Sequence, residues 1–126
     1  MNAFVPDHAI IWAEIPVTDM ERAKAFYAAV LQNTLVDDDP GPNPISMFVV
    51  KEKGRAGHLY PGKPAAPGTG STVHLAVPAP LEDAMERLEA NGGSVVTPVI
   101  EIPAGRFAYC LDPDGNSIGL FSPSGA

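Results

Sequence analysis

The sequence predicts an α+β domain made of two βαβββ modules, whose mixed sheets curl around a cleft. Residues 12–16 can be laid over residues 74–78 at an offset of 62, about half of the 126 residues, and a helical pattern follows each segment. A stretch rich in proline and glycine, residues 61–70, separates the two halves. One module alone has too little sheet to cover its apolar face, whereas two can enclose a shared cavity. We therefore expect one domain over residues 1–126, with modules at about 8–61 and 71–123.

Composition excludes several classes of function. The chain is long enough for one self-sufficient core, and its 15 acidic against 8 basic side chains give a net charge of −7. A surplus of negative charge repels phosphate backbones and anionic lipids, so nucleic acid and membrane surfaces are not expected partners. The sequence contains no apolar run near the roughly 20 residues of a membrane span. A single cysteine, Cys110, cannot form an internal disulfide, and we expect a cytoplasmic protein.

The first module follows from short local patterns. Residues 9–17 are β-branched and aromatic and predict a strand. Thr18 and Glu21 form a capping box that predicts the start of a helix over residues 19–31, where apolar side chains recur at helical spacing. The acidic run at 37–39 and the PGPNP sequence after it indicate a solvated turn. Two further strands are predicted, and they lie at residues 45–51 and 55–60.

The second module repeats that order. Residues 72–77 read as a strand, and residues 80–90 as a helix that ends at a Gly-Gly pair. Strands are then predicted at 94–102, where Pro98 interrupts the pattern, and at 107–111 and 117–121. Between the last two strands, the sequence DPDGN supplies the residues of a tight hairpin turn.

These motifs carry a family resemblance. The EIPVTD-x-E-x-A-x-x-FY sequence at the first helix and LDPDGNSIGL at the last hairpin resemble the vicinal oxygen chelate superfamily, over nearly the whole chain. This is the group of glyoxalase I, bleomycin-resistance proteins and extradiol dioxygenases. The resemblance implies the fold of that group, a small-molecule ligand and a homodimer, in which modules pair within one chain or swap between two.

The resemblance also implies four positions for ligands of a divalent metal, two in each module. Motif by motif, they fall on Trp12, His58, His74 and Gly119. An indole N–H has no lone pair for a metal and glycine has no side chain, so only the two histidines can bind one. Catalytic sites generally supply three or more protein ligands. A glyoxalase I-like lyase or isomerase loses two of its four ligands here, and an extradiol dioxygenase loses two of its three.

Glu14 offers a replacement ligand. Residues two apart in a strand share a face, so Glu14 should point to the same side as Trp12. His58, His74 and Glu14 would then resemble a two-histidine, one-carboxylate site for Zn, Fe, Ni or Mn. The alternative is that Glu14 pairs with an arginine such as Arg55 or Arg106, or forms a hydrogen bond in the cleft, while the histidines are polar lining. We favour this alternative.

The sequence therefore predicts a small-molecule-binding protein without the usual four-ligand metal centre. No other catalytic signature is present, and catalytic residues are not assigned. A divergent metal-dependent glyoxalase-type enzyme or oxygenase stays as the second hypothesis, and a domain whose cleft is filled by its own aromatic side chains as the third. The expected cleft residues share strand faces with the four motif positions, and they are Trp12, Glu14, His58, Tyr60, His74, Gly119 and Phe121.

Overall fold

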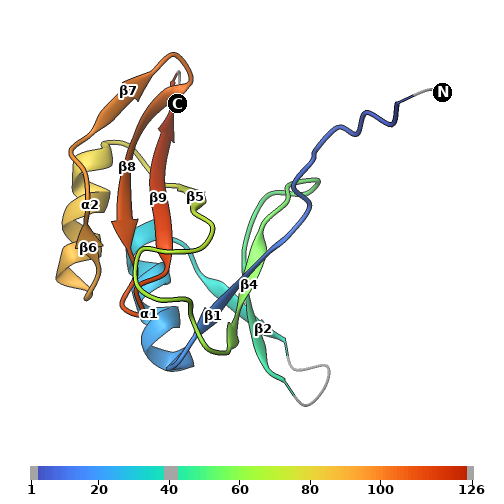
Figure 1. Ribbon diagram of the computed structural model, residues 1–126, viewed down its shortest axis with the longest axis vertical. Coiled ribbons are helices and arrows are strands. Elements are labelled where there is room, and N and C mark those ends of the chain that lie inside the picture. The colour runs from blue at the N-terminus through green and yellow to red at the C-terminus, as the bar shows by residue number, and fades with distance from the viewer. Residues whose placement is uncertain (1–2, 39–42, 125–126) are drawn as a thin grey trace.

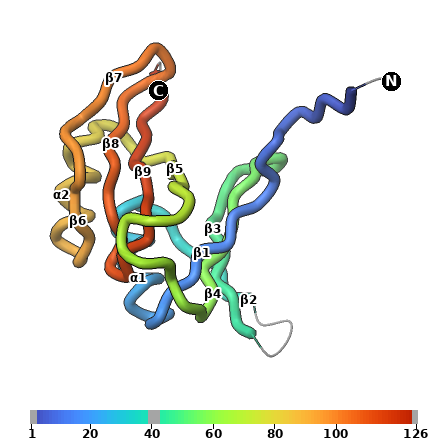
Figure 2. The backbone as a smooth tube through the Cα atoms, viewed as in Figure 1, coloured from blue at the N-terminus to red at the C-terminus, as the bar shows by residue number. Residues whose placement is uncertain are grey.

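The computed structural model describes residues 3–38 and 43–124, and over these residues the chain forms two helices and nine strands in two separate sheets. Figure 1 shows the two sheets standing apart, with residues 3–12 leading away from the first sheet. The backbone trace in Figure 2 shows the same open arrangement. The predicted α+β fold of two βαβββ modules is confirmed.

The first module forms a four-stranded mixed sheet in the order β1-β4-β3-β2. Strands β1 and β4 run parallel, whereas β4, β3 and β2 are antiparallel neighbours. Its elements are β1 (Ala13–Val17), α1 (Met20–Leu31), β2 (Leu35–Asp38), β3 (Ile45–Phe48) and β4 (Gly57–Pro61).

The second module repeats this topology with one additional short strand. The sheet has the order β5-β9-β8-β6, and β7 also pairs with β8. Strands β5 and β9 are parallel, as β1 and β4 are. Its elements are β5 (Val73–Ala76), α2 (Leu81–Ala90), β6 (Ser94–Val95), β7 (Ile100–Ile102), β8 (Gly105–Leu111) and β9 (Ser117–Pro123). The predicted interruption at Pro98 therefore separates β6 from β7.

One core joins the two modules. Helices α1 and α2 pack on each other, and each also packs on its own sheet. The Arg87 guanidinium of α2 donates hydrogen bonds to the carbonyl oxygens of Ala29 and Val30 at 3.0 and 2.9 Å, so it satisfies carbonyls in the last turn of α1. Fifteen buried side chains form a single hydrophobic cluster; the largest wholly buried ones are Tyr27, Phe26, Leu59, Leu81, Leu88, Ile118 and Leu120.

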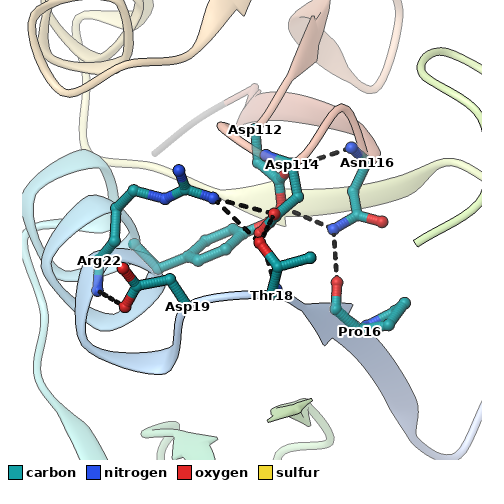
Figure 3. A network of polar contacts seen from close by, with 8 residues as sticks. Pro16, Thr18, Asp19, Arg22, Asp112, Asp114 and Asn116 are labelled. Atoms are coloured by element: carbon teal, nitrogen blue, oxygen red, sulfur yellow. Dashed lines mark hydrogen bonds and ion pairs between the residues drawn. The ribbon is translucent and has the colours of Figure 1, made fainter. Parts of the chain in front are cut away.

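The predicted hairpin turn also links the modules. The buried carboxylate of Asp112 accepts hydrogen bonds from the Tyr27 hydroxyl (2.6 Å), from the backbone N–H groups of Asp114 and Asn116 (2.9 Å each), and from the Asn116 side chain (2.8 Å). Asn116 donates a further hydrogen bond to the Pro16 carbonyl in β1 at 2.8 Å. Figure 3 shows this network, which connects the β8–β9 turn to the first module. The turn residues therefore have a role in joining the modules that the sequence analysis did not foresee.

Two local predictions are wrong. The predicted cap Thr18 donates its hydroxyl to Asp114 instead, and Asp19 is the N-cap, where its carboxylate accepts from the Arg22 backbone N–H at 3.1 Å. Residues 37 and 38 belong to β2 rather than to a solvated turn, because they pair with Ser46 and Ile45 of β3. Asp37 also contacts Lys24 at 3.1 Å and the Ser46 hydroxyl at 2.9 Å. Both ion-pairing and hydrogen bonding lower the pKa of Asp37. The rest of that predicted turn, residues 39–42, lies outside the described residues.

Candidate functional site

Four of the predicted cleft residues lie together on the first sheet. His58 of β4 is at the centre, opposite Glu14 of β1 in the strand register. The Trp12 indole N–H donates to His58 Nδ1 at 2.8 Å, and His58 Nε2 lies 3.3 Å from Glu14 Oε1. The Tyr60 ring meets the His58 ring edge to face, with centroids 6.1 Å apart. Trp12, His58 and Glu14 are thus linked by successive polar contacts, and we call them the Trp12–His58–Glu14 chain.

The Trp12 indole N–H at one end of this chain determines which ring nitrogen of His58 carries the hydrogen. Because Nδ1 of His58 accepts from the indole, it carries no proton, and the ring hydrogen is on Nε2. Nε2 lies 3.3 Å from the Glu14 carboxylate. The His58 side chain is only 12% exposed, whereas Glu14 is 67% exposed. The chain therefore runs from a partly buried imidazole to a carboxylate that faces solvent.

In the second sheet, Gly119 makes room for the imidazole of His74. His74 of β5 is opposite Gly119 of β9 in the register, and a Cβ atom added at Gly119 would overlap the ring atoms of His74. The missing side chain at Gly119 therefore accommodates His74, which can lie across the neighbouring strand.

Aromatic rings surround His74. Its ring centroid lies 5.4 Å from Phe107, 5.6 Å from Tyr109 and 6.3 Å from Phe121, at steep interplanar angles. Phe107 and Phe121 are nearly parallel, with centroids 6.0 Å apart. We call His74, Phe107, Tyr109 and Phe121 the aromatic face.

Phe107 and Tyr109 were missed as site residues, although the hairpin could have identified them. The DPDGN turn pairs Leu111 with Ser117, and this register places Tyr109 opposite Gly119 and Phe107 opposite Phe121. Counting back from the predicted turn would have given both pairs.

Three cavities lie at or beside these residues. One, of about 490 Å3, is bordered by His74, Ala76, Ile102, Phe107 and Phe121 of the second sheet. A second, of about 420 Å3, lies between the first sheet and β5 and also includes His74. The third, of about 170 Å3, lies between β1, residues 65–71 and the start of β9, and Glu14 is one of its lining residues. The cavity on the aromatic face has the largely apolar lining that is typical of small-molecule sites.

The proposed metal ligands do not come together within one chain. Glu14 and His58 touch, but no group of three or more His, Cys, Asp or Glu side chains within residues 3–38 and 43–124 is placed to hold a metal ion. His58 also has no free lone pair here, because Nδ1 accepts from Trp12 and Nε2 carries the proton. The residues of a single chain therefore do not fit the metal that the resemblance implies.

The register corrects one assignment. His58 faces Glu14 across its sheet, and Gly119 faces His74 across the other. If His58 and Gly119 correspond, the counterpart of His74 is Glu14 and not Trp12. The reason is a longer connection: residues 77–80 separate β5 from α2, whereas only residues 18 and 19 separate β1 from α1. The sequence overlay aligned Pro16 of β1 with Pro78 of the longer connection, and so it shifted the two strands relative to each other.

The arginines proposed as partners of Glu14 lie elsewhere. Arg106 forms a bidentate pair with Glu82, with nitrogen to oxygen distances of 3.1 and 2.6 Å, and lies 3.4 Å from Glu101. Hydrogen bonding to Arg106 lowers the pKa of Glu82 to about 2. Arg55 donates to the backbone carbonyls of residues 53 and 54. Glu14 therefore has neither arginine as a partner, and its carboxylate lies 3.3 Å from His58 Nε2 instead.

Comparison with protein families supports the fold. A family model described as Glyoxalase/Bleomycin resistance protein/Dioxygenase superfamily matches residues 7–120. Among curated proteins, the glyoxylase-like CFP32 of Mycobacterium bovis and of Mycobacterium tuberculosis is 28% identical over 116 residues, which is 87% of this chain. The chain spans 44% of the length of these relatives.

Solved structures match as well. A glyoxalase/bleomycin resistance protein from Albidiferax ferrireducens is 25% identical, with a TM-score of 0.68 over 91% of this chain and 98% of the other. TnmS3, an antibiotic binding protein from a Streptomyces species, is 28% identical, with a TM-score of 0.61 over 95% of this chain and 100% of the other. In the part of the chain that the structure describes, neither helix has the length and apolar character needed to cross a bilayer.

Proposed function

Because the chain belongs to the Glyoxalase/Bleomycin resistance protein/Dioxygenase superfamily, we propose that it binds a planar aromatic small molecule and does not use a four-ligand metal centre. The observation that carries this proposal is the aromatic face beside a cavity of about 490 Å3. Ring faces and edges attract other aromatic systems by offset stacking and edge-to-face contacts. The similarity to an antibiotic binding protein is in keeping with such a ligand.

Binding of acridine, a neutral compound of three fused rings, tests this proposal. Equilibrium dialysis measures the affinity directly. We expect saturable binding in the wild type and a loss of about tenfold in affinity for Phe121→Ala, because one aromatic contact contributes up to about 1.5 kcal/mol beyond buried area.

Val36→Ala is the matched control, since Val36 of β2 is an exposed apolar residue that belongs neither to the aromatic face nor to residues 3–12. Unaltered affinity in Phe121→Ala, or an equal loss in Val36→Ala, would contradict the assignment of the aromatic face. If acridine does not bind at all, the proposed function itself is wrong.

We further propose that two copies associate and complete the cleft between them. Residues 3–12 expose several large apolar side chains, including Phe4 (87%), Val5 (84%) and Ile10 (78%), which is typical of a surface that another chain covers. Strands β1 and β5 are both edge strands, with one paired side each. Sedimentation velocity should give twice the monomer mass at micromolar concentration, and a monomer at 100 μM would exclude the dimer.

The metal-dependent alternative rests on the position of Glu14. Glu14 holds the place in the first sheet that His74 holds in the second, and it touches His58. A second copy that brought its own His74 nearby would therefore supply a third ligand. Protein purified without an affinity tag should contain Zn, Fe, Ni and Mn only at substoichiometric levels. Stoichiometric metal that is lost in the His58→Ala/His74→Ala double variant would overturn the metal-free proposal and favour a glyoxalase I-like lyase or isomerase over a dioxygenase.

A further inference from the structure

Of the described residues, only His74 places a polar side chain on the wall of the cavity at the aromatic face. The other residues that line this cavity of about 490 Å3 are Ala76, Ile102, Phe107 and Phe121, and their side chains contain no nitrogen or oxygen. A ligand in the cavity can therefore form a side-chain hydrogen bond with these lining residues only through the imidazole of His74. Small-molecule sites typically combine an apolar wall with a few such polar groups, which orient the ligand.

The position of the imidazole leaves its Nε2 atom available. The ring atoms nearest to a Cβ added at Gly119 are Nδ1, Cε1 and Cγ, so the Nδ1 edge lies over Gly119 and the Nε2 edge is turned away from it. The two ring nitrogens of His58 contact Trp12 and Glu14. Those of His74, which is exposed, form no hydrogen bond with another residue in the described part of the chain. A ligand that covers the aromatic face must therefore replace the hydrogen bonds that the imidazole makes to solvent, or lose them.

The neighbouring rings determine which part of a ligand meets this nitrogen. The rings of Phe107 and Phe121 are 13° from parallel, and the imidazole of His74 stands at 83° and 89° to them. A planar ligand that stacks parallel to the two phenylalanines is therefore nearly perpendicular to the imidazole and does not stack on it. Contact with Nε2 is then made by a substituent on the rim of the ligand.

We propose that His74 selects planar aromatic ligands that carry a hydroxyl group on the rim of the ring system, and that this hydroxyl pairs with Nε2. This inference rests on the proposed function, since it names the chemical class of the same ligand. A hydroxyl group both donates and accepts, so it can pair with Nε2 in either tautomer of the imidazole. A carboxylate only accepts, and the net charge of −7 on the chain disfavours an anion.

Two ligands with the same ring system separate the hydrogen bond from the ring contacts. 2-Naphthol carries one hydroxyl group and naphthalene carries none, and equilibrium dialysis at pH 7 gives both affinities. We expect the wild type to bind 2-naphthol about fivefold more tightly, because a hydrogen bond contributes about 1 kcal/mol net. In His74→Phe, which keeps a flat ring without a nitrogen, this preference should disappear while naphthalene still binds.

Two further variants separate hydrogen bonding from shape. His74→Gln keeps a donor and an acceptor, so it should retain part of the preference even though the ring is lost. Gln32→Met is the matched control, because it removes an exposed polar side chain of similar size at the end of α1, and it should keep the full preference.

The outcomes distinguish this inference from the proposed function. Equal binding of the two ligands by the wild type, a preference that survives in His74→Phe, or an equal loss in Gln32→Met would overturn the inference and leave the proposed function in place. Failure of both ligands to bind while acridine binds would also overturn it. Failure of all three compounds would contradict the proposed function itself.

The nitrogen chemical shifts of His74 give a reading in the wild-type protein. In 15N-labelled protein, two-bond 1H–15N correlations resolve the ring nitrogens, and absence of the His74 signals from His74→Gln assigns them. We expect saturation with 2-naphthol to move the Nε2 signal further than saturation with naphthalene does, because only the hydroxyl forms a hydrogen bond there. An Nε2 signal that responds equally to the two ligands would overturn the pairing.

Discussion

The hydrogen bond between Tyr27 and Asp112 should be a major link between the two modules. The Tyr27 hydroxyl donates to Asp112 Oδ2 at 2.6 Å, and Tyr27 and Asp112 are 0% and 3% exposed. Hydrogen bonds to a charged group contribute about 1.5–3 kcal/mol. Tyr27→Phe removes only this bond, because three N–H donors still satisfy the carboxylate. We expect the free energy of unfolding to fall by about 2 kcal/mol.

Asp112→Ala should lower the free energy of unfolding by more than Tyr27→Phe does. It leaves the Tyr27 hydroxyl, the Asn116 amide and two backbone N–H groups without their acceptor, and loss of a buried charged partner typically costs about 3–5 kcal/mol. The double variant should then be close to Asp112→Ala alone, since the tyrosine hydroxyl has no partner left to lose.

Urea unfolding followed by far-UV circular dichroism, at one fixed protein concentration, measures these differences. Tyr109→Phe is the control, because Tyr109 is exposed and the same atom is removed; it should change stability by less than about 0.5 kcal/mol. A Tyr27→Phe variant within 0.5 kcal/mol of the wild type, or strictly additive effects in the double variant, would refute the reasoning about this contact.

Three further predictions concern single positions. Gly119→Ala should displace the His74 ring, because the added methyl group overlaps it. The free energy of unfolding should fall by about 1–3 kcal/mol and acridine binding should weaken; unchanged NMR signals of the His74 ring would contradict the overlap. Burial and the neighbouring Asp112 raise the pKa of Tyr27 well above its usual value, so its folded form retains the proton above pH 10, where the unfolded chain loses it. Stability relative to Tyr27→Phe should therefore fall by about 1.4 kcal/mol per pH unit there, and parallel profiles of the two proteins would contradict this. Burial raises the pKa of the Cys110 thiol to about 11, so iodoacetamide should modify native protein at pH 8 roughly a hundredfold more slowly than unfolded protein; equal rates would show that the thiol is accessible.

The order of elements was predictable because it depends on local patterns. The helix spacing, the proline and glycine linker and the DPDGN turn each act over a few residues, and the structure has all of them in the expected order. Strand β2 was missed because its acidic residues give no local strand signal, and its ladder depends on pairing with β3. The capping of α1 was misassigned for a similar reason, since Thr18 bonds to Asp114, nearly a hundred residues away.

The sequence predicted which side of a sheet the site residues occupy, but it did not predict which residues they contact. Alternation placed Glu14 on the side of Trp12, and the resemblance placed His58 in the same cleft. His58 does contact both of them. The sequence could not show that Gly119 receives the His74 ring, because that contact depends on the register of two strands distant in the chain. The different lengths of the strand-to-helix connections in the two modules hid this register in the sequence overlay.

The unequal connections have a consequence for how the two halves of such a duplicated domain are compared. The longer connection of the second module displaces its helix along the chain, so an overlay that follows the helix starts pairs the wrong strand residues. In the strand register, Glu14 and His74 hold the same place in their sheets, opposite His58 and Gly119. The two halves therefore present a carboxylate and an imidazole at one and the same position, a difference that becomes visible only when the strands are superposed.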